Sequence, residues 1–199
     1  MAPFVYLASG SPRRRELLTQ IGVPFQVLNV AVDESVVAGE TAEAYVSRLA
    51  HLKALAGLRA RPTGDSAPVL AADTSVVLDG CVLVKPTDRA DGERMLRQMS
   101  GRTHSVLTAV ALAGALGVQS RLSRSEVRFR DLSAAEIASY WDTGEPHDKA
   151  GGYAIQGAGA VFVADLRGSY SGVMGLPLYE TAELLALQGV PRWRCASAG

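Results

Sequence analysis

The chain has 199 residues, of which 48% are hydrophobic and 20% are charged, as expected for a globular protein that buries a substantial core. Its 20 lysines and arginines balance 20 aspartates and glutamates, so no overall field attracts polyanions, which argues against a general nucleic-acid binder. We expect one domain over residues 1–190 and a loose tail over residues 191–199.

The cysteines and the apolar segments indicate a cytoplasmic protein. Cys81 and Cys195 have neither a disulfide framework nor a zinc-site spacing, which fits a reducing compartment. The apolar start lacks a preceding basic region, and polar residues interrupt it before it could act as a signal sequence. No apolar run approaches the roughly 20 residues that a membrane-spanning helix requires.

The first elements are a strand, a helix and a second strand. The apolar run 4–8 predicts a short buried strand that ends at a glycine and proline turn. Ser11 suits the N-cap of the following helix and Pro12 its first position, and the helix should end near Gly22. The run 25–30 predicts another strand.

The next stretch predicts a long helix, a central strand and a third helix. Apolar residues at near-helical spacing predict an amphipathic helix over 41–58. The β-branched run 69–78 predicts a strand, and the Asp-Gly pair at 79–80 is a strong hairpin-turn signal. A helix over 87–99 should be capped by Thr87.

The second half begins with a strand pair. The segments 104–112 and 121–129 predict paired strands joined through a glycine-containing connection at 114–117. Ser133 and Glu136 have the spacing of a capping box and predict a helix that ends near residue 141.

The remaining segments complete an α/β pattern. The stretch 142–159 has no clear period and is rich in glycine, so we expect a functional loop there. A strand over 161–166 and a helix over 178–188 follow. Because the central strand pair is typical of an antiparallel sheet, the pattern predicts an α/β fold with a mixed sheet and flanking helices.

The turn between the first strand and the first helix is a candidate anion site. Ser9 and Ser11 offer hydroxyls, and the backbone N–H groups at a helix start favour an anion. Arg13 and Arg14 are the basic candidates, although three consecutive arginines cannot all face one ligand. For this segment alone, a capped surface helix with basic side chains is the favoured alternative.

A carboxylate inside the central strand requires an explanation. Asp73 and Thr74 interrupt an otherwise apolar run, and burying a carboxylate is costly unless it is paired, hydrogen-bonded or bound to a metal. Metal ligation or general-base catalysis would account for it. A strand whose polar face meets solvent, or a structural ion pair, is the alternative.

Isolated charges elsewhere could complete such a site. Lys53 and Lys85 each interrupt an apolar element and could hold a phosphate oxygen, but a surface lysine with a buried stem is the default interpretation. Glu34 follows a strand and could contribute an oxygen ligand to a hard metal ion. A solvated loop is again the alternative.

The glycine-rich segment offers a group suited to a nucleobase. Small residues allow close approach of the backbone, and Gln156 carries both a donor and an acceptor. An ordinary glycine-rich loop would look similar. His51 and His104 lack metal-ligand spacing and are predicted to be structural or surface residues.

Taken together and in this order, these segments resemble the Maf family of nucleotide pyrophosphatases. The matching segments are LASGSPRR (7–14), VDE (32–34), ADT (72–74), KP (85–86), SGRTH (100–104), DKAGGYAIQG (148–157) and GLP (175–177). The similarity spans nearly the whole chain, and the joint order carries it.

This resemblance implies a fold and a reaction. The fold would have two lobes around a central cleft, similar to that of inosine triphosphate pyrophosphatase, and the protein would often assemble as a homodimer. The reaction would depend on a divalent metal, magnesium or manganese, and water would attack the α-phosphorus of a nucleoside triphosphate while pyrophosphate leaves. Neither a nucleic acid nor a membrane is an expected partner.

The resemblance also implies roles for individual residues. Asp73 matches the family's proposed proton acceptor, although it could instead bind the metal with Glu34. The positions associated with base selection are Arg13, Thr74 and Gln156. The groups that would surround the phosphates are Ser9, Arg13, Lys53 and Lys85, with Ser11 and Arg14 in the same turn.

The late motif assigns the chain to one branch of the family. Its DKAGGYAIQG segment resembles the branch that prefers dTTP and UTP, whereas the 7-methyl-GTP branch carries a Lys-Ser-Glu-like segment at 154–156. Val84, Gly152 and Ala154 are small departures that remove no charged or hydrogen-bonding group. The open alternatives are 7-methyl-GTP, a modified pyrimidine nucleotide, and a nucleotide-binding regulator of septum formation without essential catalysis.

Overall fold

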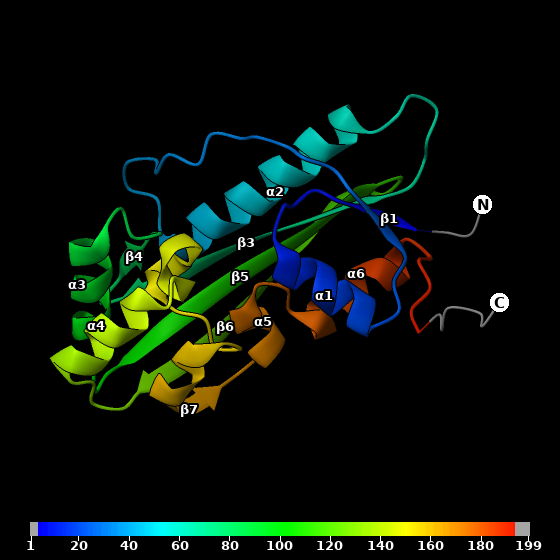
Figure 1. The fold of residues 1–199 in the computed structure, drawn as a ribbon. Coiled ribbons are helices and arrows are strands. Elements are labelled where there is room, and N and C mark those ends of the chain that lie inside the picture. Colours follow the sequence, from blue (N-terminus) through cyan, green and yellow to red (C-terminus); the bar gives the residue numbers. More distant parts are fainter. Residues whose placement is uncertain (1–3, 194–199) are drawn as a thin grey trace.

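The computed structural model describes residues 4–193, and its centre is one mixed sheet of seven strands. The strands are β1 (Val5–Leu7), β2 (Phe25–Val27), β3 (Val69–Leu78), β4 (Cys81–Leu83), β5 (Thr103–Gly114), β6 (Gly117–Phe129) and β7 (Val163–Arg167). They lie in the order β2-β1-β3-β5-β6-β7, and β4 pairs with β3 beside that path. β1 is parallel to β2 and β3, and the other pairs are antiparallel. The predicted α/β fold with a mixed sheet is confirmed (Figure 1).

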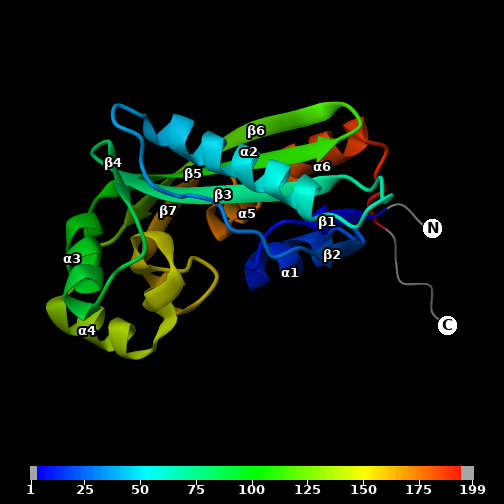
Figure 2. The same ribbon diagram turned by 90° about the horizontal axis from the view of Figure 1, so that it is seen from above.

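Helices cover both faces of this sheet. They are α1 (Pro12–Gln20), α2 (Ala42–Ala60), α3 (Arg89–Met99), α4 (Ala134–Asp142), α5 (Tyr170–Met174) and α6 (Leu178–Leu187). α2 lies along one face, and the other helices pack against the opposite face (Figures 1 and 2). Within residues 4–193, every helix is too short or too polar to cross a membrane.

The alternation of side chains along β3 explains these layers. Successive strand residues point to opposite faces, so Val69 and Ala71 pack under α2, whereas Leu70 and Ala72 face α1 and α6. α2 approaches the sheet closely. A Cβ atom on Gly57 would lie 2.5 Å from a methyl group of Val69, so this position of the helix requires glycine.

The face opposite α2 carries two separate cores, which make the two lobes. The first lobe joins α1 and α6 to β1 and the start of β3, and its largest buried residues include Leu7, Leu18, Leu70, Leu112 and Leu176. The second lobe joins α3 and α4 to the end of β3, with Leu96, Met99, Phe129 and Ile137 fully buried. Figure 2 shows α3 and α4 at one end of the sheet and α1 at the other.

Several predicted boundaries differ from the structure. β6 begins at Gly117, four residues before the predicted start at 121, because its exposed first half pairs with β5 without an apolar pattern. β2 ends at Val27, so the predicted strand at 25–30 was too long. β7 begins at Val163, so the predicted strand at 161–166 began too early. The short helix α5 was not predicted.

The helix caps confirm the predicted positions of Ser11 and Ser133 and correct that of Thr87, although the Ser11 side chain forms no capping hydrogen bond. The Thr41 side chain accepts a hydrogen bond from the Ala44 N–H, and Ser133 with Glu136 forms the predicted capping box. The cap of α3 is Asp88 rather than Thr87, since the Asp88 carboxylate accepts from the Asp91 N–H at 2.8 Å. An extended aspartate one residue later satisfies one of the free N–H groups of the first turn.

Residues 142–159 are less irregular than the sequence indicates. They contain short 3-10 turns over Glu145–Asp148 and Ala150–Gly152, and a third turn covers Ala158–Phe162. Of the predicted loose tail, residues 194–199 lie outside the described residues. The N–H of Trp193, which the structure does describe, donates to the carbonyl of Ile21 at 2.8 Å.

A histidine in the second lobe makes stability depend on pH. His104 is 2% exposed, and its Nε2 lies 2.8 Å from the hydroxyl of Tyr153. Burial lowers the pKa of His104 from 6.5 to about 4, so the unfolded chain binds a proton that the folded protein does not bind between these pH values. Stability is therefore lost as the pH falls through this window.

We expect this loss to be on the order of 3 kcal/mol between neutral pH and pH 4. Urea unfolding of His104→Gln should show a smaller acid loss than the wild type, because glutamine does not titrate. His51→Gln is the matched control, since His51 is exposed. Equal acid losses in all three proteins would assign the pH dependence to other groups.

Candidate active site

A gap at the edge of the sheet forms the floor of a cleft. β3 meets β1 at Val69 and Leu70 and meets β4 at Val76 to Leu78. In the part of the chain that the structure describes, residues 71–75 have no strand beside them on this edge. β1 is followed by the turn into α1, and β4 is followed by Lys85, so both flanking strands end at the gap.

The cleft has a volume of about 600 Å³, which falls within the roughly 300–1,000 Å³ typical of small-molecule sites. It lies between the two lobes. All ten site residues predicted from the sequence line it: Ser9, Ser11, Arg13, Arg14, Glu34, Lys53, Asp73, Thr74, Lys85 and Gln156. The fold thus brings together residues that lie up to 147 positions apart in the sequence, from Ser9 to Gln156 (156 minus 9).

Two carboxylates share one lysine at this floor. Asp73 belongs to the side of β3 that faces α2, where Lys53 donates to its Oδ1 at 2.7 Å. The same Lys53 Nζ lies 2.6 Å from Oε1 of Glu34, which comes from the segment before α2. Burial raises the pKa of Asp73, whereas the hydrogen bond from Lys53 lowers the pKa of Glu34. Asp73 is therefore the stronger base of the two.

The segment that carries Glu34 is held against α2. The hydroxyl of Tyr45 donates to the carbonyl of Glu34 at 2.9 Å. Arg48 donates to the Ser35 carbonyl at 2.9 Å and forms an ion pair with Glu40. α2 thereby fixes the backbone at Glu34 and at the residue that follows it.

Arg14 connects three parts of the cleft wall. Its Nε donates to the Gly175 carbonyl at 2.7 Å, its Nη1 to Ser9 Oγ at 2.9 Å, and its Nη2 to Thr74 Oγ1 at 3.3 Å. Within residues 4–193 no carboxylate forms an ion pair with it, and burial lowers its pKa. A largely buried cation without a counter-ion is suited to bind an anion.

Thr74 and Asp73 lie on opposite faces of β3, and both side chains line the cleft. Its hydroxyl lies 3.0 Å from that of Thr108 on β5, and Thr108 donates to the carbonyl of Gly172 at 2.7 Å. Adjacent strand residues point to opposite faces. Because the cleft opens at an unpaired edge, both Asp73 and Thr74 can line it.

The glycine-rich segment closes the second side of the cleft. Gly151 and Gly152 have φ values of 68° and 69°, a left-handed backbone that favours glycine. The N–H of Gly151 donates to the carbonyl of Val84 at 3.2 Å, which holds this segment beside Lys85. Gln156 lines the cleft at the end of the same segment.

Several residues of the site were not assigned from the sequence. Gly175 supplies the carbonyl that orients Arg14, Thr108 supports Thr74, and Tyr45 fixes Glu34. Asp148 and Lys149 also line the cleft, and they form an ion pair with each other. In the sequence, Tyr45 is recognisable only as part of the apolar face of a helix, so no pattern indicates that its hydroxyl binds Glu34. Gly175 belongs to the GLP segment (175–177), whose resemblance to the Maf family implies no role for it.

The acidic groups of the cleft fit a metal ion only in part. Among residues 4–193, no group of three or more His, Cys, Asp or Glu side chains is arranged to hold a metal ion without other ligands. Glu34 and Asp73 nevertheless lie on either side of one ammonium group. Two carboxylates are enough for Mg²⁺ when substrate phosphates complete its ligand set, so the residues present fit a metal that binds together with a nucleotide.

Comparison with known proteins supports the family resemblance. The family model described as Maf-like protein matches residues 4–188. A dTTP/UTP pyrophosphatase of Saccharophagus degradans is 54% identical over 191 residues, covering 96% of this chain and 91% of that protein. One of Pectobacterium atrosepticum is 56% identical over 182 residues, covering 92% and 91%.

A solved structure was also found. The nucleoside-triphosphatase, or dITP/XTP pyrophosphatase, of Mycobacterium abscessus aligns over 94% of this chain and 97% of its own. The TM-score is 0.44 at 17% identity, a likeness too weak to support an argument about function. The family match and the close relatives are sufficient, and the chain belongs to the Maf family.

Proposed function

We propose that this chain hydrolyses dTTP and UTP to the nucleoside monophosphate and pyrophosphate. The observation that carries the proposal is the cleft in which buried Asp73, the arginines of the first turn and Gln156 lie together. The relatives named dTTP/UTP pyrophosphatase, more than 50% identical over most of the chain, support the same activity.

The cationic groups would bind the triphosphate. Arg13, Arg14 and Lys85 line the cleft at the start of α1 and after β4. The turn at Ser9 and Ser11 presents hydroxyls at a helix N-terminus, where an anion is favoured. The charge of the leaving pyrophosphate would be offset by these groups, which are already in place before substrate binds.

A divalent cation, Mg²⁺ or Mn²⁺, belongs to the proposal. Glu34 would hold it, Asp73 would be a second ligand if it binds the metal directly and does not act as the base, and the phosphate oxygens would complete its ligands. When bound, such an ion would neutralise charge on the triphosphate and on the departing pyrophosphate. Lys53 now holds both carboxylates, so it would release one of them and turn toward a phosphate oxygen.

Asp73 is the candidate general base. It would accept a proton from the water that attacks the α-phosphorus. Because burial raises its pKa, it is a better proton acceptor than an exposed aspartate. Direct metal binding is the other role open to the same carboxylate, and the two roles predict different metal dependence.

Gln156 would read the base. Its amide can donate to O4 and accept from N3–H, the edge that thymine and uracil share. Cytosine presents an amino group at position 4 and lacks the N3 proton. With the amide in the orientation that binds thymine or uracil, both hydrogen bonds would be lost, and a site built to form them rejects such an analogue.

A substrate panel tests this proposal. We expect dTTP and UTP to give the highest kcat/KM for pyrophosphate release, above CTP, 7-methyl-GTP and the purine triphosphates, and activity only with Mg²⁺ or Mn²⁺. Modified pyrimidine triphosphates that keep the O4 and N3–H edge should also be accepted. A panel led by 7-methyl-GTP or a purine nucleotide would contradict the base assignment.

Homodimeric assembly, which the family resemblance implies, and a cytoplasmic location, which the cysteines and apolar segments of the sequence indicate, complete the proposal. Light scattering of the purified protein would measure the first. Fractionation of cells that produce it would measure the second.

A further inference from the structure

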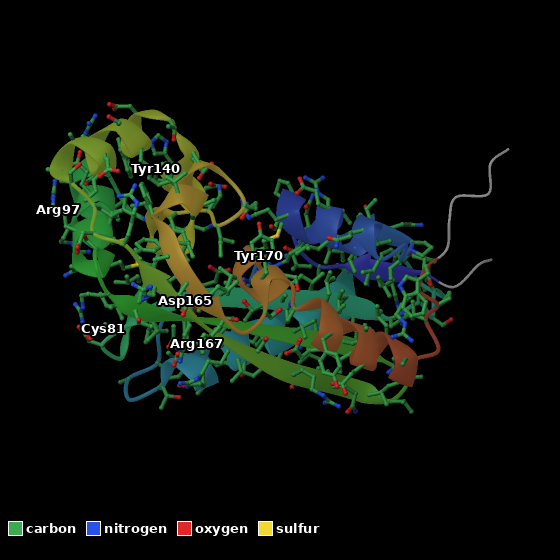
Figure 3. All side chains as sticks on the ribbon, turned by 90° about the horizontal axis from the view of Figure 1, so that it is seen from below. Cys81, Arg97, Tyr140, Asp165, Arg167 and Tyr170 are labelled. Carbon is green, nitrogen blue, oxygen red and sulfur yellow. The ribbon has the colours of Figure 1, made fainter. Side chains whose placement is uncertain are left out.

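The segment that carries Gln156 is fastened by two side chains on the side away from the cleft floor. Tyr140, near the end of α4, and Glu145, in the 3-10 turn after it, both contact this segment through its backbone. Tyr140 is 5% exposed, and in Figure 3 it lies in the second lobe, among α4 and the turns that follow it. Neither residue lines the cleft.

The contacts lie on both sides of Gln156. Before it, the N–H of Ala154 donates to the Tyr140 hydroxyl at 3.1 Å. After it, Ala158 donates to Glu145 Oε2 at 2.9 Å, and Gly159 donates to Oε1 at 3.0 Å. The Tyr140 hydroxyl in turn donates to Glu145 Oε1 at 2.6 Å. One continuous network therefore joins residues 154 and 159.

The glycines around Gln156 leave room for the Glu145 carboxylate and the Tyr140 hydroxyl. A Cβ atom on Gly157 would lie 2.0 Å from Glu145 Oε2, and one on Gly159 would lie 2.7 Å from the Tyr140 hydroxyl. Glycine at both positions is thus required by the network. The Tyr140 ring packs edge-on against Phe162 with ring centroids 4.9 Å apart, which fixes the direction of its hydroxyl.

The charge state of the pair favours these bonds. Burial favours the neutral form of Glu145, but hydrogen bonds from Tyr140, Gly159 and Ala158 keep its pKa below the ordinary value. Burial raises the pKa of Tyr140. The carboxylate stays charged and the phenol stays protonated at neutral pH, so one accepts and the other donates.

The Gln156 side chain itself is left available. In the part of the chain that the structure describes, no protein group hydrogen-bonds to its amide. The backbone on both sides of Gln156 is held by Tyr140 and Glu145, whereas the Gln156 side chain lines the cleft. Such an arrangement fixes the place from which the Gln156 side chain enters the cleft before the ligand arrives, and its amide stays free to pair with the base.

We propose that Tyr140 and Glu145 are positioning residues that set the orientation of Gln156 and thereby the selection of the base. This inference rests on the proposed function, because it assigns to Gln156 the reading of thymine and uracil. Neither residue touches the substrate. Their loss would loosen the segment and weaken discrimination, while the phosphate site and Asp73 remain intact.

The test uses Tyr140→Phe and Glu145→Gln. Phenylalanine keeps the ring packing but cannot bind Ala154 or Glu145. Glutamine places an amide donor where a carboxylate oxygen now accepts. Losing a charge-assisted hydrogen bond is expected to raise KM for dTTP about ten-fold with kcat nearly unchanged, and to lower the dTTP-over-CTP ratio of kcat/KM about ten-fold.

The matched controls are Tyr179→Phe and Glu183→Gln on α6, because both residues are exposed and far from the segment in sequence. They should keep the wild-type ratio. Hydrogen exchange measured by mass spectrometry should be faster for peptides covering 150–160 in the two test variants only. Tyr140→Phe removes the acceptor of the Ala154 N–H, and Glu145→Gln replaces one of the two oxygens that accept from Ala158 and Gly159.

The outcomes separate the two proposals. A wild-type protein without preference for dTTP and UTP would overturn the proposed function, and this inference with it. A wild-type preference that both variants retain would overturn the inference alone. An equal loss of kcat/KM for dTTP and CTP would also overturn it, since a merely structural role lowers both. Unchanged exchange over 150–160 would show that the pair does not hold the segment.

Discussion

Replacing Asp73 with asparagine is expected to lower kcat for pyrophosphate release from dTTP by about 10²–10⁴-fold, the usual contribution of a general base. Asparagine has nearly the same shape, and its amide oxygen can still accept the hydrogen bond that Lys53 donates at 2.7 Å. An amide does not accept a proton from water at neutral pH. Steady-state kinetics and thermal unfolding should therefore show lost turnover in a folded protein.

Asp142→Asn is the matched control for this change. Asp142 is exposed and forms its ion pair with Arg89 on the surface, so the same loss of charge occurs away from the cleft. Turnover in Asp73→Asn that equals the turnover of this control would remove Asp73 from the mechanism.

The residual activity of Asp73→Asn separates the two roles of the carboxylate. If Asp73 holds the metal, the concentration of Mg²⁺ or Mn²⁺ that gives half-maximal rate should rise. If Asp73 acts only as the base, that concentration should stay close to the wild-type value while kcat falls. Metal titrations of both proteins measure this difference.

Replacing Arg14 with lysine is expected to lower kcat/KM about 10–10²-fold and the free energy of unfolding by about 1–3 kcal/mol. Three nitrogens of one planar guanidinium reach Gly175, Ser9 and Thr74. An ammonium group keeps the charge but cannot contact all three acceptors in that geometry. Kinetics with dTTP and urea unfolding measure the two effects.

Arg15→Lys is the matched control, because Arg15 is the next residue and is exposed. Arg14→Met separates charge from shape, since it removes the charge and keeps much of the apolar stem. We expect activity to fall in the order wild type, Arg14→Lys, Arg14→Met. If Arg14→Lys behaves like Arg15→Lys, the guanidinium geometry is unimportant and only its charge acts.

Local patterns in the sequence predicted most of the regular elements. The β-branched run of β3 and the helical spacing of α2 are strong signals over long segments, and both elements formed close to the predicted bounds. The weak points were elements without such a pattern. The first half of β6 is exposed, and α5 has only five residues, so neither carries a periodic apolar signal.

The residues of the site could be chosen from the sequence, but their geometry could not. The Ser-Gly-Ser turn, Asp73 and Gln156 were selected by residue type and by their joint order, and the cleft contains them all. The sequence does not determine which arginine turns inward. Arg14 is held by Gly175, 161 positions away in the sequence, and no local pattern encodes that contact.

By itself, the sequence determined the mixed α/β fold, the family and the set of candidate residues, because periodicity, helix caps and the order of motifs are local patterns of residues. Only the tertiary structure decided that Lys53 joins Glu34 to Asp73, that Arg14 binds Gly175, and that Tyr140 and Glu145 fasten the segment around Gln156. The physical reason is that these contacts join side chains and backbone groups of different elements, so they depend on how the strands, helices and turns pack, and no local pattern encodes that packing.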